Sequence, residues 1–273
     1  MTENFVYEPV RTAYADTLLA SVGERGVLCD YYAEEAKDIY QDLMDDEDES
    51  AIAEAKEYST RIRPGSGPVL ELAVGTGRVT FPLLELGFEV TALELSDTML
   101  DVLRRRLRNA PKDVRDRCTV VQGDMGAFKL DKRFGTVIIS PGTLSVLDDD
   151  GRAGLYASVR EHLAPGGRFL VGVGQQDPAK SEPEERSQEL SGKSGREYVL
   201  HHARLFSGGD EINDITIYPA DKTADPFVVC THRMRIPPMD PIVREFEQAG
   251  FAVTVRPFTG KRPEDVLMLE ASL

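Results

Sequence analysis

Residues 69–94 combine an apolar run, three small residues and an acid in an order that few folds can accommodate. The run Val69–Leu72 is typical of a buried parallel strand. Ala73, Gly75 and Gly77 follow it directly. Such small residues let the backbone turn sharply and approach a ligand closely. The stretch therefore predicts a strand that ends in a tight, ligand-facing turn.

A helix and a second strand are predicted after this turn. The helix runs from about Arg78 to Leu86 and ends at Gly87, and the strand covers 88–93. Glu94 stands at the carboxyl end of that second strand. Strand, glycine turn, helix, strand and acid in this order are typical of half of a nucleotide-binding crevice.

Two kinds of cofactor compete for such a unit. A dinucleotide-binding turn carries a third glycine for close helix packing, and its helix N-terminus faces a pyrophosphate. Counted from Gly75 and Gly77, that third position is Thr80, so the dinucleotide pattern is incomplete. Glu71, near the end of the first strand, would repel a pyrophosphate but attract an ammonium group. Glu94 offers acceptors to a ribose diol in either case.

The combination of Glu71–Gly77 with Glu94 resembles motif I and the acidic second-strand end of class I S-adenosylmethionine-dependent methyltransferases. Val121–Phe128 and Leu163–Phe169 are similar to the third-strand end and to the turn before the fifth strand in that family. Ala73 takes the place of the first glycine of motif I. Within the family, the chain looks like small natural-product N-methyltransferases, among them enzymes that act on amino sugars or on peptide amines.

The resemblance covers residues 69–173 well and the remainder more loosely. Together with the alternation of strands and helices, it implies an α/β fold with a doubly wound, seven-stranded Rossmann-like sheet. An N-terminal helical lid and a small antiparallel capping sheet, inserted before the last helix, are expected in addition. The predicted segments are the lid at 1–64, the S-adenosylmethionine-binding core at 65–176, the antiparallel cap at 177–238, and the helix and strands that complete the core at 239–273. Within the cap, the polar stretch Asp177–Arg196 is expected to be a loop, and three strands are expected between 197 and 236.

In open α/β sheets the ligand lies outside the carboxyl ends of the central strands, where the predicted strand ends converge. The resemblance implies that the glycine turn lies against the methionine part of the cofactor and that Glu94 holds the ribose hydroxyls. Leu95 and Met99 would flank the adenine. Asp124 would accept a hydrogen bond from the adenine amine with Met125 packed on the ring, although local turn bonds are the alternative for Asp124. The candidate cofactor-binding residues are Tyr32, Glu71, Ala73, Gly75, Gly77, Glu94, Leu95, Met99, Gly123, Asp124, Met125 and Ser140.

The reaction implied by the resemblance is in-line displacement at the sulfonium methyl group, which leaves S-adenosylhomocysteine. The protein then contributes chiefly proximity and alignment, and an amine acceptor must arrive neutral. Tyr40 and His232 are the candidate catalytic residues, and Tyr32 or Tyr40 would fold over the cofactor or orient an amine. Simple packing is the alternative for a tyrosine on an amphipathic helix. His201 and His202 point to opposite faces of a strand, so at most one of them faces a pocket.

Composition narrows the function further. The net charge of −15 argues against a nucleic-acid partner. No apolar run reaches the roughly 20 residues that span a bilayer, and the first residues lack the features of a signal peptide. The three cysteines are scattered, and no cluster has metal-ligand spacing, so reduced thiols, no metal and a cytoplasmic location are expected. The expected partner is a small molecule or peptide with an amine, and assembly as a homodimer is compatible with the sequence.

The leading hypothesis is therefore a methyltransferase that acts on an amine of a small metabolite or peptide. O-methylation of a small molecule and a non-catalytic S-adenosylmethionine-binding protein are the alternatives. A nicotinamide-dependent oxidoreductase is disfavoured by Thr80 and Glu71.

Overall fold

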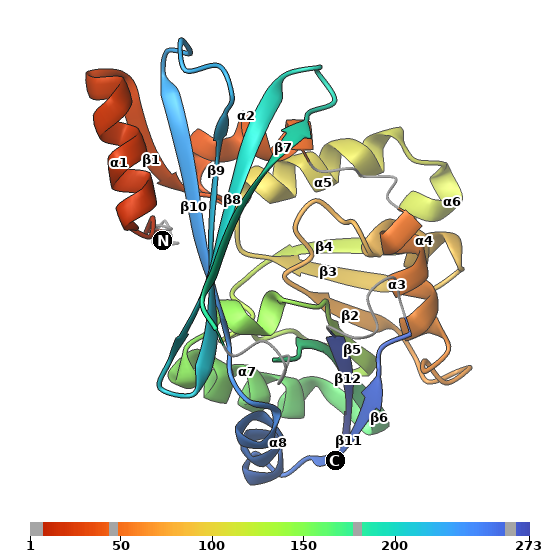
Figure 1. Ribbon diagram of the computed structural model, residues 1–273. Coiled ribbons are helices and arrows are strands. Elements are labelled where there is room, and N and C mark those ends of the chain that lie inside the picture. Colours follow the sequence, from red (N-terminus) through yellow and green to blue (C-terminus); the bar gives the residue numbers. More distant parts are fainter. Residues whose placement is uncertain (1–7, 44–48, 177–181, 260–265) are drawn as a thin grey trace. The chain divides into compact units, whose positions relative to one another are not determined.

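The computed structural model describes residues 8–43, 49–176, 182–259 and 266–273. Within these ranges the chain forms two compact units (Figure 1). The larger unit takes in the described residues of Asp46–Asp177 and Pro237–Leu273. The smaller unit takes in those of Met1–Asp45 and Pro178–Ile236.

The larger unit is built on a seven-stranded sheet with the strand order β11-β12-β6-β5-β2-β3-β4. Strands β6, β5, β2, β3 and β4 run parallel, while β12 is antiparallel to β6 and to β11. The strand bounds are β2 Val69–Leu72, β3 Val90–Glu94, β4 Cys118–Gln122, β5 Phe134–Ile139, β6 Leu163–Gly174, β11 Ala252–Pro257 and β12 Val266–Ser272.

Helices cover both faces of this sheet, so the central strands are buried on both sides. Along β2, Leu70 and Leu72 belong to one apolar cluster and Val69 to the other, as alternation of side chains requires. The first cluster is covered by α7 Asp149–His162 and α8 Met239–Gln248. The second is covered by α3 Glu49–Ser59, α4 Thr80–Glu85, α5 Asp97–Asn109 and α6 Lys112–Arg115. A short 3₁₀ turn, η3 Thr143–Val146, follows β5. This is the doubly wound sheet that the sequence predicts.

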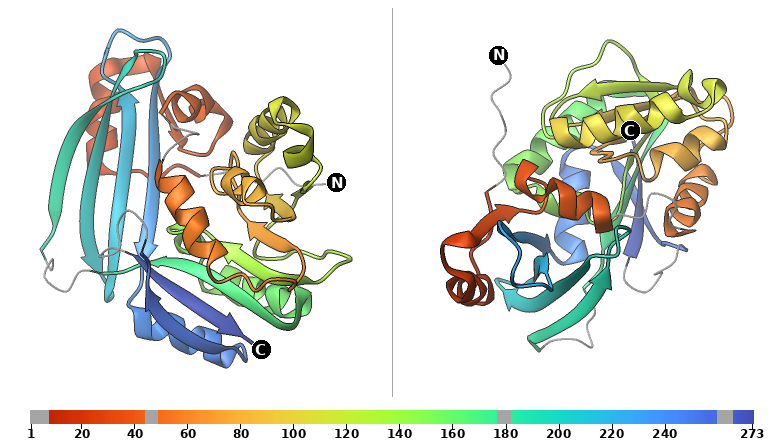
Figure 2. Two further views of the ribbon diagram at one scale, coloured as in Figure 1. Left: turned by 90° about the vertical axis from the view of Figure 1, so that its right-hand side faces the viewer. Right: turned by 90° about the horizontal axis from the view of Figure 1, so that it is seen from above.

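The smaller unit is a five-stranded sheet with the order β1-β10-β9-β8-β7 (Figures 1 and 2). Its strands are β1 Gly26–Asp30, β7 Glu184–Ser191, β8 Glu197–Ser207, β9 Asp210–Pro219 and β10 Phe227–Ile236. Only β1 pairs in parallel, and the other neighbours are antiparallel. Helix α1 Ala13–Val22 packs on one face and the short turn η2 Glu34–Ala36 with helix α2 Lys37–Leu43 on the other. The turn η1 Gly23–Arg25 joins α1 to β1.

Two expectations from the sequence are wrong in this unit. The stretch 177–196, expected to be a loop, contains the strand β7. Most of its side chains are exposed and polar, so β7 lacks the apolar alternation of a strand and is held by backbone pairing to β8 and by an ion pair of 2.7 Å between Glu184 and Arg204. The N-terminal segment, expected to be helical, contributes the strand β1 to the capping sheet. Its partner β10 lies about 200 residues later in the chain, so the local sequence pattern does not indicate this pairing.

The four predicted segments, with boundaries at 64, 176 and 238, stay predictions. In the described residues, no helix is both long and apolar enough to cross a membrane. The same residues hold no group of three or more histidine, cysteine or acidic side chains arranged for a metal ion.

Candidate functional site

The turn after β2 has an unusual backbone. The φ angles of Ala73, Gly75 and Gly77 are 52°, 57° and 89°, all in the left-handed region. Within the described ranges Ala73 is the one residue other than glycine with a positive φ, which is costly for a residue with a Cβ atom. Strain of this kind concentrates at ligand-binding turns. At Gly77 packing also excludes a side chain, since a Cβ would lie 2.6 Å from Cδ1 of Leu103 on α5.

Glu94 ties the end of β3 to this turn. Its Oε2 accepts from the backbone N–H of Gly75 at 2.8 Å, and its Oε1 accepts from Leu95 and Ser96 at 2.9 and 2.8 Å. The side chain is buried, which raises the pKa of Glu94, and the three N–H groups oppose that shift. A carboxylate has about four lone-pair sites, so Oε2 keeps capacity for a ligand hydroxyl.

A buried group of charges lies beside the turn. Glu71 accepts from the Thr80 hydroxyl at 2.7 Å, and Arg78 donates to Oε2 of Glu54 at 2.5 Å. The pKa of Glu71 is raised to about 8, chiefly by burial and also by nearby Glu54, against the lowering effects of Thr80 and Arg78. The second oxygen of Glu54 is buried and finds no hydrogen-bond partner among the described residues. The carboxylate oxygen of Glu54 that is left over suits a ligand that carries an ammonium group.

The sequence missed two members of this group. Glu54 lies on α3, inside the segment 1–64 that the sequence indicates only as a helical lid, and Arg78 is indicated only as the start of a helix. An acidic and a basic side chain on the elements that flank a glycine turn are the sequence signal that would have indicated Glu54 and Arg78.

The remaining predicted residues of the larger unit follow the parallel strands β3 and β4 on one side of β2 and β5 on the other, so they lie along one edge of the sheet. Leu95 is half-buried, whereas Met99 and Met125 are buried. Asp124 is exposed, and its Oδ1 accepts from the N–H of Gly126 at 2.7 Å, which is the local turn bond foreseen as the alternative.

Gly123 and Ser140 take part in the same edge through their backbones. The N–H of Gly123 donates to the carbonyl of Glu94 at 3.0 Å, and the carbonyl of Ser140 accepts from Thr143 at 3.2 Å. The structure thus brings together the turn residues, Glu94 and the two later strand ends, as expected from the parallel order of the strands.

The candidate catalytic residues lie in the smaller unit, in a cluster that the sequence did not reveal. His232 Nδ1 lies 3.4 Å from Oδ2 of Asp30, and Oδ1 of Asp30 accepts from the N–H of Tyr32 at 2.8 Å. The ring of Tyr32 meets that of His232 edge-on, with centroids 5.0 Å apart. Tyr40 is buried, and its ring centroid lies 6.0 Å from that of Tyr32 and 5.2 Å from that of Tyr31.

Asp30 is the residue of this cluster that sequence reasoning missed. It ends the short run Gly26–Asp30, in which an acid closes an apolar strand as Glu94 closes β3. A buried carboxylate beside Nδ1 holds a proton on that nitrogen and leaves Nε2 of the imidazole as an acceptor. The pair can therefore receive a proton at Nε2.

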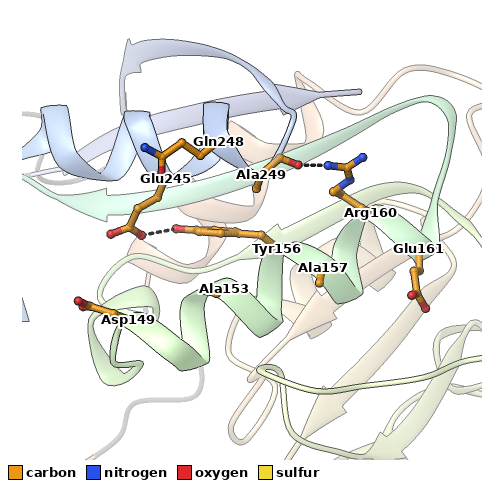
Figure 3. A pocket seen from close by; sticks show the side chains of 9 residues that line it. All are labelled: Asp149, Ala153, Tyr156, Ala157, Arg160, Glu161, Glu245, Gln248 and Ala249. Atoms are coloured by element: carbon orange, nitrogen blue, oxygen red, sulfur yellow. Dashed lines mark hydrogen bonds between the residues drawn. The ribbon is translucent and has the colours of Figure 1, made fainter.

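A separate hollow of about 720 Å³ lies between α7 and α8 (Figure 3). Tyr156 points across it and donates to Glu245 at 3.2 Å, and Arg152 donates to the same carboxylate at 2.8 and 2.9 Å. None of the predicted site residues lines this hollow. The bonds of Tyr156 and Arg152 to Glu245 link the two helices.

Comparison with known proteins agrees with the strand-edge site. A family profile described as a methyltransferase domain matches residues 69–167. A dTDP-3-amino-3,4,6-trideoxy-alpha-D-glucopyranose N,N-dimethyltransferase of Streptomyces venezuelae is 34% identical over 125 residues, which are 44% of this chain and 48% of the relative. A cypemycin N-terminal methyltransferase of a Streptomyces species is 30% identical over 148 residues, 49% of this chain and 57% of the relative. The chain spans about half the length of these curated relatives.

One group of solved structures matches over nearly the whole chain. The glycopeptide N-methyltransferase MtfA in complex with S-adenosylhomocysteine is 54% identical, with a TM-score of 0.68 over 97% of this chain and 99% of that one. The same enzyme in complex with S-adenosylmethionine is 53% identical, with a TM-score of 0.69. These matches confirm the family and the cofactor predicted from the glycine turn. The chain belongs to the class I S-adenosylmethionine-dependent methyltransferases.

Proposed function

We propose that the protein transfers a methyl group from S-adenosylmethionine to an amine of a peptide or amino-sugar natural product. The structural observation that carries the proposal is the Asp30–His232 pair, because an ammonium group must lose a proton before its nitrogen can attack. The similarity to a glycopeptide N-methyltransferase over nearly the full chain supports an amine as the acceptor.

The larger unit fits the cofactor. The buried oxygen of Glu54 that finds no partner among the described residues suits its ammonium group, and the free capacity of Glu94 suits its ribose. Leu95 supplies apolar surface for the adenine, as do Met99 and Met125. The backbone at Ala73, Gly75, Gly77 and Gly123, with Asp124 and Ser140, completes the proposed set. When bound, the cofactor supplies a sulfonium methyl group that a neutral amine can displace.

The smaller unit prepares the acceptor in this proposal. His232 takes a proton from the acceptor amine at Nε2, while Asp30 keeps the other ring nitrogen protonated. Tyr40 orients the amine by hydrogen bonding, and Tyr32 holds the imidazole in place through its edge contact. Residues 1–64 act as a lid over the cofactor. A cytoplasmic location and a homodimer are further proposals, open to fractionation and to sedimentation.

The decisive experiment supplies purified protein with S-adenosylmethionine and a matched panel of acceptors. The panel holds a peptide with a free N-terminal amine, its N-acetylated form, an amino sugar and the corresponding hydroxyl sugar. Mass spectrometry should find the added methyl group only on the two free amines. A methyl group on the hydroxyl sugar would make O-methylation the function. Binding of S-adenosylhomocysteine without transfer to any acceptor would favour a non-catalytic role.

Tyr40→Phe separates the proposed role of the hydroxyl from packing. The variant should fold normally and turn over more slowly, because the ring stays and the hydroxyl is lost. Tyr31→Phe, in the same aromatic cluster, is the matched control and should keep its activity. Normal turnover of Tyr40→Phe would leave Tyr40 a packing residue.

A further inference from the structure

A second hollow lies in the smaller unit, between the start of α1 and the five-stranded sheet. Its volume is about 280 Å³. Its walls are largely apolar, with Ala13 and Tyr14 on one side and Ala203 and Leu205 of β8 on the other. The polar lining residues are Thr12, Glu185, His201, Asp214, Thr216 and Arg233.

Two buried polar atoms in this hollow find no hydrogen-bond partner among the described residues. The side chain of His201 is 7% exposed, and its Nδ1 lies 3.0 Å from the hydroxyl of Ser187. Its ring stacks on that of Tyr14, with the ring centroids 3.6 Å apart. The other nitrogen, Nε2, finds no hydrogen-bond partner among the described residues. Within the same ranges, Oγ1 of Thr216, a residue only 1% exposed, also finds none. Buried groups of this kind are rarely left unsatisfied, because each carries the cost of its desolvation.

The strand register places the two groups together. His201 and Thr216 are directly paired on the antiparallel strands β8 and β9. Side chains of such a pair leave the same face of the sheet, with Cβ atoms about 5 Å apart. One small polar group of a ligand can therefore reach both.

The charges around the hollow point to an uncharged ligand. Asp214 and Arg233 neutralise each other through two hydrogen bonds of 2.6 and 2.7 Å. Oε2 of Glu185 lies 3.9 Å from Nε2 of His201, too far for a hydrogen bond, and its side chain is mostly exposed. Burial lowers the pKa of His201, so the imidazole is neutral near pH 7. A hydroxyl group both donates and accepts, and it satisfies His201 and Thr216 in either tautomer of the ring.

Ordered water alone is a poor occupant of this space. A water molecule takes up about 30 Å³, so several would be needed, and the alanine, leucine and tyrosine walls offer them few partners. A compact molecule with an apolar body and one hydroxyl group fits both the walls and the two polar atoms.

This hollow is distinct from the Asp30–His232 cluster. Thr231 of β10 is paired with Thr216, and His232 is the next residue along the strand. Because side chains alternate, His232 leaves the opposite face of the sheet from Thr216 and His201. Ligand binding in this hollow is therefore independent of the proposed methyl transfer.

We propose that the α1 face of the five-stranded sheet holds a second small-molecule site, in which His201 and Thr216 bind the single hydroxyl group of a compact, uncharged, otherwise apolar molecule. Phenol is the probe for this site, with benzene and benzoate as controls that lack the hydroxyl group or add a charge. The measurement is a titration followed by the imidazole signals in ¹H–¹³C NMR spectra, which the four histidines keep simple.

Phenol should shift the His201 signal in a saturable way, benzene should bind about tenfold more weakly or worse, and benzoate should not bind. Thr216→Val keeps the shape and removes the hydroxyl. It should weaken phenol about tenfold and raise the thermal midpoint of the free protein, because a buried unpaired group is lost. Ala203→Leu should fill the hollow and abolish binding. His202→Gln is the matched control, since His202 faces the other way and bonds to Asn213 at 2.6 Å, and it should leave phenol binding unchanged.

Absence of a saturable shift at His201, up to the solubility of phenol, would overturn the proposal. So would an unchanged phenol affinity in Thr216→Val. A lower thermal midpoint in Thr216→Val would mean that ordered water already holds this hydroxyl, which also overturns it.

Discussion

His232 Nδ1 lies 3.4 Å from Oδ2 of Asp30, although 202 residues separate the two in the chain. They meet because β1 and β10 pair in parallel, with Asp30 opposite Thr231, the residue that precedes His232. The second oxygen of Asp30 is held by the N–H of Tyr32, so the carboxylate has a fixed orientation.

Asp30→Asn should lower methyl transfer by roughly 100-fold, within the range usual for loss of a general base. The amide nitrogen of asparagine cannot accept the Nδ1 proton, so the imidazole loses the tautomer that leaves Nε2 free to accept. Affinity for S-adenosylhomocysteine should not change. Single-turnover rates and calorimetric titration measure the two effects separately.

The control for Asp30→Asn is His202→Gln. His202 and His232 are both paired with Ile215, one from each side, so they share a face of the sheet. This variant should keep full transfer activity. An unaffected single-turnover rate in Asp30→Asn would reduce the pair to a structural contact.

The contrast between the two units shows what local pattern can predict. The buried run, the glycine turn and the acid of 69–94 are contiguous, so β2, β3 and the place of Glu94 follow from sequence. Two residues after Glu94, the hydroxyl of Ser96 accepts from the N–H of Met99 at the start of α5, as a serine at a helix N-cap does.

The smaller unit depends instead on pairing between distant segments. The strand β1 is short and β7 is polar, so neither has a local signature, and Asp30 was missed with β1. Cys29 and Cys230 are likewise scattered in sequence but paired in the structure, with their sulfur atoms 3.8 Å apart. The cofactor-binding roles at the strand edge remain predictions, because position alone does not establish contact with a ligand.

Glu94→Ala should weaken binding of S-adenosylhomocysteine by about 1–3 kcal/mol, or roughly 5–150-fold, if two buried ribose bonds are lost. It should also lower the thermal midpoint, because the N–H groups of Gly75, Leu95 and Ser96 lose their acceptor. Glu94→Gln keeps one carbonyl oxygen and should lose less on both measures.

Calorimetry and thermal unfolding of the same preparations test this prediction. Asp97→Asn, which removes an exposed charge in the first turn of α5, is the control and should retain its affinity. If Glu94→Ala binds as well as the unaltered protein, Glu94 has no part in holding the ribose.

Glu71 should make the stability of the protein fall as pH rises. Burial raises its pKa from 4.5 to about 8 in the folded chain, so between these values the folded state binds more protons than the unfolded one. The free energy of unfolding then decreases with pH, by at most about 1.4 kcal/mol per unit. Below 4.5 both states are protonated and above about 8 both are ionised, so the contribution is constant there.

Glu71→Gln isolates this effect, because the amide oxygen can still accept from Thr80. Urea unfolding from about pH 5 to about pH 8 should show the unaltered protein losing stability relative to the variant. Glu85→Gln, on the exposed side of α4, is the matched control. Its free energy of unfolding should change with pH as that of the unaltered protein does. A constant difference between Glu71→Gln and the unaltered protein over this range would contradict a raised pKa at Glu71.

Gly77 and Gly87 separate backbone strain from packing, because their φ angles are nearly equal at 89° and 92°. An alanine at either position loses about 1–2 kcal/mol of stability, because its Cβ atom disfavours a left-handed backbone. At Gly87 a Cβ would meet nothing within 4 Å, but at Gly77 it would meet Leu103 and the ring of Phe81 at 2.6 and 3.1 Å. Gly77→Ala should therefore lose a further 1–3 kcal/mol, roughly the usual cost of overpacking, and urea unfolding of both variants measures the difference. Equal losses would mean that α5 and Phe81 shift freely, and that the turn needs glycine at 77 for its backbone alone.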